Sequence, residues 1–176
     1  MIKGLAKLIV ALNGNQKKSQ IAAGFAWGVL LGFLPVGNAF WIMLFVLSFF
    51  LVHNQGAKVV SMAVLKLLMP LLYPLTDSIG WLILNAEFLR DFLTFLYNTP
   101  FVLFTRFNNT LVAGALAAGL VLWLPVFIIF YFFIPFYRNS LLPKILRSSL
   151  AKLLGNIPFI EKIQQAIGVI HAVSSD

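Results

Sequence analysis

Three long apolar runs, each interrupted by proline, constrain the fold of this chain more than any other feature. They cover residues 21–52, 59–84 and 110–137. As one helix, the first run would extend about 48 Å at 1.5 Å per residue, whereas the hydrocarbon core of a bilayer is about 30 Å thick. Neither side of Pro35 holds the roughly 20 residues of a full span. We therefore expect a helical hairpin that dips into the membrane and returns, or two short tilted helices, with the turn at "FLPVGN".

Composition also favours an all-α integral membrane protein. Hydrophobic residues make up 61% of the 176 positions and charged residues 10%, with a mean hydropathy of +0.96. A typical soluble domain is about 45–50% apolar and about 25% charged. The length fits about one domain. The chain has no cysteine, which excludes disulfides and thiolate chemistry.

The net charge of +8 is concentrated near the two ends of the chain. The flanking basic residues are Lys3, Lys7, Lys17, Lys18, Arg138, Lys144, Arg147, Lys152 and Lys162. The positive-inside rule then predicts two cytoplasmic termini and an even number of crossings. Anionic lipid headgroups, and not nucleic acid, are the expected partner of this charge.

Charge and hydrophobic periodicity divide the chain into three parts. Residues 1–18 are expected to form an interfacial amphipathic helix that is retained, 19–140 a membrane domain, and 141–176 a basic amphipathic cytoplasmic tail. A coiled-coil seam with a partner is the alternative for the tail. Within the membrane domain, residues 85–107 also indicate an interfacial helix, which runs up to Pro100.

A ridge of glycines precedes the first break. Gly24, Gly28 and Gly32 recur every four residues, which lets another helix approach closely. The break itself contains Pro35, which ends the helix, and Gly37, which gives the backbone freedom. We interpret it as structural; substrate binding at the same turn is the alternative.

Asn38 completes this break. Its side chain is suited to hydrogen-bonding the backbone groups that a turn leaves free at membrane depth, where lipid cannot satisfy them. The turn must therefore be covered by protein or lie in a wet cavity.

The second run holds Lys66, Pro70, Pro74 and Asp77, and is expected to be broken by its prolines, so that it need not cross. An intramembrane lysine is often functional; alternatively, Lys66 lies near an end and snorkels. A bend at the prolines is one way to bring Lys66 and Asp77 together.

The first and third runs indicate a weak internal repeat. Residues 23–36, "AGFAWGVLLGFLPV", match residues 113–126, "AGALAAGLVLWLPV", without a gap, and Pro35 aligns with Pro125. Paired Gly/Pro-interrupted segments in two halves of a chain are typical of repeated broken helices in transporters. We therefore expect a second break at Pro125.

No catalytic or cofactor-binding constellation is recognisable. His53 and His171 lie in different segments without a carboxylate or second ligand at metal spacing, so both are interpreted as loop or surface residues. There is no phosphate-binding loop and no nucleophile elbow. The expectation is a protein without enzymatic activity, cofactor or metal.

The first region resembles a bacterial family, the domain of unknown function two thousand and sixty-two. The string "KKSQIAAGFAWGVLLGFLPVGNAFWIMLFVLSFFLVHN" carries the resemblance, together with "MPLLYPLTDSIG" and a Gly/Ala-rich last run. The matching positions are Ser19, Ala22, Gly24, Ala26, Gly28, Gly32, Pro35 and Asn54. The resemblance covers roughly residues 17–140 and implies a small bacterial inner-membrane protein that accompanies a large envelope protein, without implying a reaction. Where the family often has Asn-Pro, this chain has Met69-Pro70.

These observations support two functional hypotheses. The first is a non-enzymatic polytopic inner-membrane scaffold or partner subunit for an envelope protein, able to self-associate. The second is a lipid or small-solute transporter whose site lies between the two breaks, with Asn38 and Lys66 facing a wet cavity. A lipid-modifying enzyme ranks third. A transporter or enzyme should bring Asn38, Lys66 and Asp77 together, whereas a scaffold leaves them dispersed.

Overall fold

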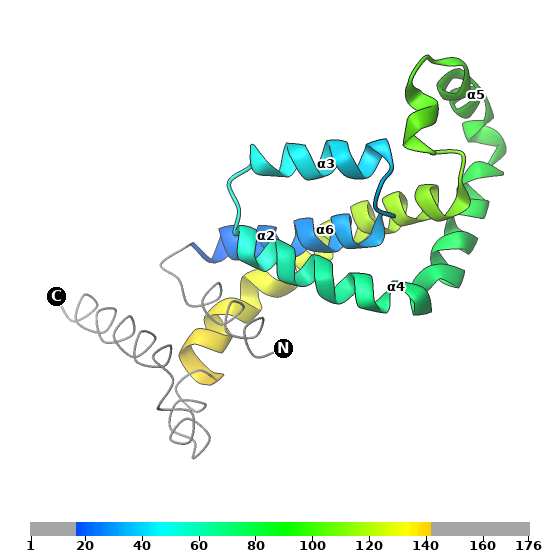
Figure 1. Cartoon of the computed structure of the whole chain (residues 1–176). Coiled ribbons are helices and arrows are strands. Elements are labelled where there is room, and N and C mark those ends of the chain that lie inside the picture. Colours follow the sequence, from blue (N-terminus) through cyan, green and yellow to red (C-terminus); the bar gives the residue numbers. More distant parts are fainter. Residues whose placement is uncertain (1–16, 142–176) are drawn as a thin grey trace.

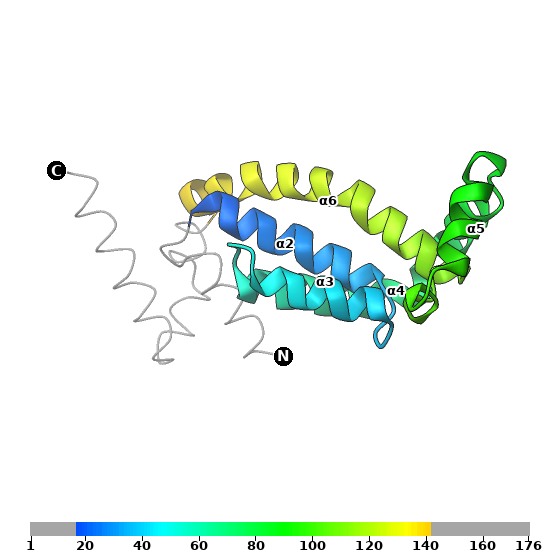
Figure 2. The ribbon, with the colours of Figure 1, turned by 90° about the horizontal axis from the view of Figure 1, so that it is seen from above.

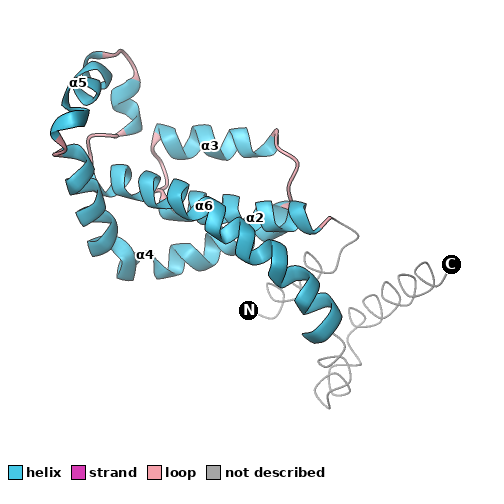
Figure 3. Ribbon diagram, turned by 180° about the vertical axis from the view of Figure 1, so that it is seen from behind, coloured by secondary structure: helices cyan, strands magenta, loops and turns pink. Residues whose placement is uncertain are grey.

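The computed structural model describes residues 17–141, in which every regular element is a helix (Figure 3). The elements are α2 (Lys18–Phe33), α3 (Ala39–Phe49), α4 (Gln55–Leu84), η1 (Glu87–Leu89), α5 (Arg90–Asn98), η2 (Val102–Thr105), α6 (Thr110–Phe136) and the π-helical turn η3 (Tyr137–Leu141). The amphipathic helices expected in 1–18 and 141–176 lie outside the described residues, apart from the border residues 17, 18 and 141.

Helices α2, α4 and α6 pack against one another in all three pairs and form the core (Figures 1 and 2). Near the start of α2, Phe25 stacks on Phe130 with ring centroids 3.8 Å apart. Near its end, Phe33 and Leu34 pack with Met69 and Val112. Helix α3 makes far fewer contacts with this bundle.

Glycines allow the three helices to approach closely. A Cβ atom at Gly28 would lie 1.8 Å from the Ser61 Oγ and 2.4 Å from the Lys58 carbonyl oxygen. A Cβ at Gly114 would lie 1.8 Å from the Thr76 carbonyl oxygen of α4. Real Cβ atoms do not reach such distances, so only glycine permits these crossings.

The prolines of the second and third runs do not break their helices, contrary to the sequence-based expectation. Helix α4 is continuous through Pro70 and Pro74, and α6 is continuous through Pro125 and Pro135. Proline inside a helix removes one backbone hydrogen bond and bends the axis, and helices of membrane proteins tolerate it when neighbours compensate. Helix α4 does bend along its length (Figure 1).

The first run does divide into two helices. After α2 ends, residues 34–38 turn the chain, and α3 runs back beside the bundle (Figure 1). The two ends of this hairpin meet, because the Asn54 amide donates to the Gln20 carbonyl oxygen at 2.9 Å. Its re-entry into a membrane stays a prediction.

Helices α4 and α6 are long and apolar enough to span a membrane. Their most apolar windows have mean hydropathies of 1.7 and 2.4, and only 17% and 11% of these windows are buried in the protein. The core helix of a soluble protein would be mostly buried. Large side chains such as Leu67 (83% exposed) and Val121 (72%) instead point outward.

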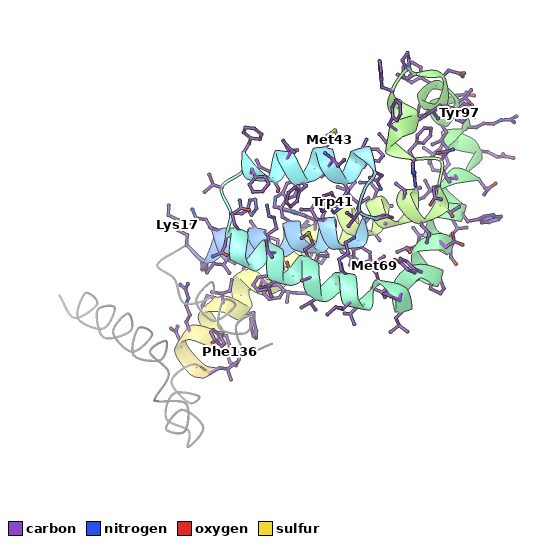
Figure 4. The ribbon with its side chains drawn as sticks, in the orientation of Figure 1. Lys17, Trp41, Met43, Met69, Tyr97 and Phe136 are labelled. Carbon is purple, nitrogen blue, oxygen red and sulfur yellow. The ribbon has the colours of Figure 1, made fainter. Side chains whose placement is uncertain are left out.

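The segment that joins α4 to α6 projects from one end of the bundle as an arm, which we define as residues 87–105 (η1, α5 and η2) (Figure 2). Figure 4 places Tyr97 of this arm at the end opposite to Lys17 and Phe136. The interfacial helix expected at 85–107 is thus helical from Arg90 to Asn98, with short 3₁₀ turns on either side.

Candidate functional site

The turn after α2 satisfies its own free backbone groups. The Asn38 Nδ2 donates to the Pro35 carbonyl oxygen at 3.0 Å, while the Asn38 Oδ1 accepts from the Trp41 amide at 2.7 Å. The Trp41 Nε1 donates to the Leu31 carbonyl oxygen at 3.1 Å. Trp41 points from α3 toward the bundle, whereas Met43 points away (Figure 4). Buried Asn38 therefore ends one helix and begins the next.

Gly37 provides the backbone conformation that this turn needs. Its φ is +91°, in the left-handed region that residues with a side chain rarely adopt. No atom lies within 4 Å of a Cβ built on it, so the conformation, and not the space, requires glycine.

Lys66 lies at the same turn, but Asp77 does not. The Lys66 ammonium donates to the Leu34 carbonyl oxygen, at the negative end of the α2 dipole. The Asp77 carboxylate instead accepts from the Thr110 hydroxyl, where α4 meets α6. The bend in α4 does not bring the two charges together, so Asn38 and Lys66 converge and Asp77 stands apart.

Three asparagines cap helices in the described part of the chain. Asn38 caps α3, Asn54 caps α4 through the Ala57 amide at 2.7 Å, and Asn109 caps α6 through the Val112 amide at 3.3 Å. Asn54 was marked in the sequence only by the family resemblance, and Asn109 was not predicted. For Asn38 and Asn109, an Asn just before an apolar run is the N-cap signal that identifies them; Asn54 is followed by the polar stretch "QGAK" and lacks that signal.

A buried lysine that was not predicted from the sequence lies under α3. Lys58, in the first turns of α4, is only 1% exposed. Its Nζ donates to the Ser48 Oγ at 2.8 Å and lies 4.2 Å from the ring centroid of Phe49 and 5.1 Å from that of Phe45. Lys58 comes after "HNQGA" between two apolar runs, and such a position is usually solvent-exposed. Burial by α3 is a tertiary effect without a local signal.

His53 lies five residues before this lysine, in the loop that leads into α4. It is 8% exposed, its ring lies 6.2 Å from that of Trp27, and neither ring nitrogen has a hydrogen-bond partner of ordinary geometry among the described residues. Burial and then the charge of Lys58 lower the pKa of His53, opposed by a weaker backbone interaction with Leu51. The residue is in a loop, as expected, but it is not a surface residue.

The remaining sequence candidates lie where they shape the backbone. Gly24 and Gly32 face Asn54 and Leu65 of the α4 segment, and Pro70 and Pro125 are exposed within continuous helices. Within residues 17–141, no group of three or more His, Asp or Glu side chains could hold a metal ion.

The described part of the chain is therefore an all-helical bundle with two helices suited to cross a membrane. The chain belongs to the bacterial family described as "Uncharacterized protein conserved in bacteria (DUF2062)", whose model matches residues 5–141. It is similar to an uncharacterized protein of Treponema pallidum (strain Nichols), with 31% identity over 162 residues, covering 92% of this chain and 100% of the relative. No solved structure matches.

Proposed function

We propose that this protein is a non-enzymatic integral protein of the bacterial inner membrane that serves as a partner subunit or scaffold for another envelope protein. The observation that carries the proposal is that the polar side chains at the break hydrogen-bond the protein's own backbone. Asn38, Trp41 and Lys66 all donate to carbonyl oxygens that the end of α2 leaves free. Because these donors hydrogen-bond the protein's own backbone, they stabilise the turn and are not free to bind a substrate, as a structural subunit requires.

Charge and length support a two-span topology with a re-entrant hairpin. Lys17 and Lys18 lie at the start of α2 and Arg138 comes after α6. These ends are adjacent, because the Lys18 Nζ lies 4.2 Å from the ring centroid of Tyr131 in α6. Glu87 and Asp91 belong to the opposite end. Under the positive-inside rule, the lysine-rich end is cytoplasmic and the arm is periplasmic. Helix α2, with 16 residues, reaches about 24 Å, less than the hydrocarbon thickness of about 30 Å.

The arm is the surface best suited to a protein partner. Its apolar side chains are largely uncovered: Phe88 is 86% exposed, Phe101 81% and Phe104 71%. Phe101 and Arg106, which bound η2, have positive φ values of 67° and 54°. Such conformations are costly for residues with a side chain and are often retained at functional sites.

Site-specific photocrosslinking in intact cells tests the proposal. A photoreactive residue at Phe95, which is 66% exposed on the arm, should give one discrete heavier product. The same residue at Leu67, 83% exposed on the apolar outer side of α4, is the matched control and should give none. Equal crosslinking at both positions, or none at either, would contradict a partner subunit that binds through its arm.

A lipid or small-solute transporter is the second candidate, favoured by the convergence of Asn38 and Lys66 at one turn. Single cysteines at positions 37, 38 and 125 of this cysteine-free chain separate the two functions. A membrane-impermeant thiol reagent should leave all three unlabelled if the protein is a scaffold, with position 98 on the arm labelled from one side only. Labelling at 37 and 38 would show a water-filled turn and favour transport.

A further inference from the structure

The corner between α3 and α4 holds two basic side chains that no described acidic residue neutralises. Lys58 is 1% exposed, and within residues 17–141 its ammonium lies against the Ser48 hydroxyl and the rings of Phe45 and Phe49. A lysine ammonium has three donors. An uncompensated buried ammonium is strongly disfavoured in an apolar environment, and pairing with an anion removes most of that cost.

The acidic residues of the described chain lie elsewhere. The whole chain contains five Asp and Glu residues, at positions 77, 87, 91, 161 and 176. Asp77 pairs with Thr110, and Glu87 and Asp91 belong to the arm, at the far end of α4 from Lys58. Glu161 and Asp176 lie outside the described residues. An anion for Lys58 must therefore come from beyond residues 17–141.

His53 is the second, independent sign of a ligand at this corner. Both of its ring nitrogens are buried without a well-formed hydrogen bond to any described residue, and the ring is close enough to Lys58 to respond to its charge. Such an imidazole provides a hydrogen-bond donor beside the ammonium. The N-terminus of α4, between the two residues, adds the positive end of a long helix dipole.

The surroundings indicate what kind of anion fits. Phe50 and Val52, shortly before His53, are 79% and 80% exposed, and Phe49 of α3 is 58% exposed. Apolar side chains therefore surround a cationic corner at the lysine-rich end of the bundle. This combination matches a molecule with an anionic head and apolar tails, and basic pockets between helices on the cytoplasmic side are suited to lipid headgroups.

We propose that Lys58 and His53 bind the phosphate of an anionic membrane lipid at the α3–α4 corner. Helix α3 covers Lys58 in the structure and makes few contacts with the bundle, so a small outward shift of Ser48 and Phe49 gives the phosphate access. The lipid phosphate then replaces Ser48 as the main acceptor for Lys58.

Thermal unfolding of the purified full chain in neutral detergent tests this site. Phosphatidylglycerol added at about ten times its Kd should raise the Tm of the wild type by about 3–6 °C. Phosphatidylcholine and inorganic phosphate are the comparison additives. If inorganic phosphate alone raised the Tm by the same amount, the site would be assigned to free phosphate and the lipid assignment would be overturned.

Three variants make the test specific. Lys58→Met, which keeps the length and removes the charge, should lose the response to phosphatidylglycerol, and Lys58→Arg should retain it. Lys17→Met removes an exposed lysine at the same end of the bundle and should respond like the wild type.

Two outcomes would overturn the lipid site. If Lys58 only anchors α3 through Ser48 and the two rings, Lys58→Met lowers the Tm equally in every lipid. If Glu161 of the chain's own tail neutralises Lys58, the wild type shows no response to phosphatidylglycerol. Both outcomes concern lipid dependence alone, so neither affects the proposed partner subunit, which the crosslinking at Phe95 tests separately.

Discussion

The segments 23–36 and 113–126 contain similar residues and end in the same Leu-Pro-Val, yet they differ in structure. The first ends a helix at its proline, and the second continues for eleven residues beyond Pro125. The difference lies in the next two residues, which are Gly37 and Asn38 after the first segment, and Phe127 and Ile128 after the second. Proline alone does not break a packed helix; the break also needs a residue that accepts positive φ and a side chain that caps the next helix.

The two segments also use their glycines differently. Gly28 lets α2 approach Lys58 and Ser61 of α4, whereas Gly114 lets α6 approach Thr76 and Gly119 lets it approach Leu30 of α2. The glycines of the first segment therefore serve one crossing, and those of the second serve two. The shared pattern reflects a shared need for close packing, without requiring the same backbone path.

Adding a methyl group at Gly114 or Gly28 should lower the free energy of unfolding more than any other change proposed here. Gly114→Ala places a Cβ against the Thr76 carbonyl oxygen, where only movement of the helix backbone relieves the overlap. We expect a loss of about 3 kcal/mol in the free energy of unfolding, or failure to fold. Gly28→Ala should cost somewhat less, because the Ser61 hydroxyl can rotate away although the Lys58 carbonyl oxygen remains close.

Denaturant titration in mild detergent measures both changes. Gly37→Asn is the matched control, since its Cβ meets no atom within 4 Å and Asn tolerates a left-handed conformation better than other residues. If Gly114→Ala is as stable as Gly37→Asn, the close crossing of α4 and α6 is wrong.

Two substitutions give the first segment the residues that follow the second segment. The double variant Gly37→Phe/Asn38→Ile places after Pro35 the residues that stand after Pro125, apart from the shared valine. It should lose about 2–3 kcal/mol, because Phe is strained at a φ of +91° and α3 loses its N-cap. Thermal unfolding measures the loss. The reciprocal variant, Phe127→Gly/Ile128→Asn, should retain its helix content by circular dichroism; a drop there would show that the local sequence alone determines the break.

The third prediction concerns the cation that supports the turn after the first segment. Lys66→Met should cost about 1–2 kcal/mol, because the Leu34 carbonyl oxygen loses its donor. Lys17→Met, which removes an exposed lysine, should change the stability by less than about 0.5 kcal/mol. The two midpoints in denaturant give the comparison. Equal midpoints would mean that Lys66 snorkels without supporting the turn.

Much of the architecture could be predicted from the sequence because its signals are local. Pro35, Gly37 and Asn38 specify a turn within four positions, and the glycine spacing marks the packed face of α2. The family assignment came from the same residues and is confirmed by the match over 5–141. The expected breaks in the second and third runs were wrong, because a helix with packed neighbours tolerates proline that would end an isolated one.

The candidate site was less predictable because it depends on tertiary contacts. Nothing near Lys58 in the sequence indicates burial; α3 covers it only after the turn at residues 34–38 reverses the chain. His53 is buried by the same reversal. By contrast, the place of Lys66 in an apolar run marks it as unusual in the sequence, but its partner, the Leu34 carbonyl oxygen, lies 32 residues earlier in the chain. The local sequence pattern therefore indicates which residues are unusual, whereas tertiary contacts determine their partners.

The smallest effect that we expect is a pH dependence of the free energy of unfolding. It arises from His53 at the α3–α4 corner and not from the turn after α2. Burial and the charge of Lys58 lower the pKa of His53 below its ordinary value. The unfolded chain therefore binds this proton at a higher pH than the folded protein does. The free energy of unfolding should be level above about pH 7 and fall as the pH drops through about 6.5 and toward the lower folded-state pKa. His53→Gln should remove this dependence, whereas His171→Gln, in the part of the chain outside the described residues, should leave it intact. Unfolding midpoints in denaturant between about pH 5 and 8 measure the slope, and a slope that survives His53→Gln would place the titrating group elsewhere.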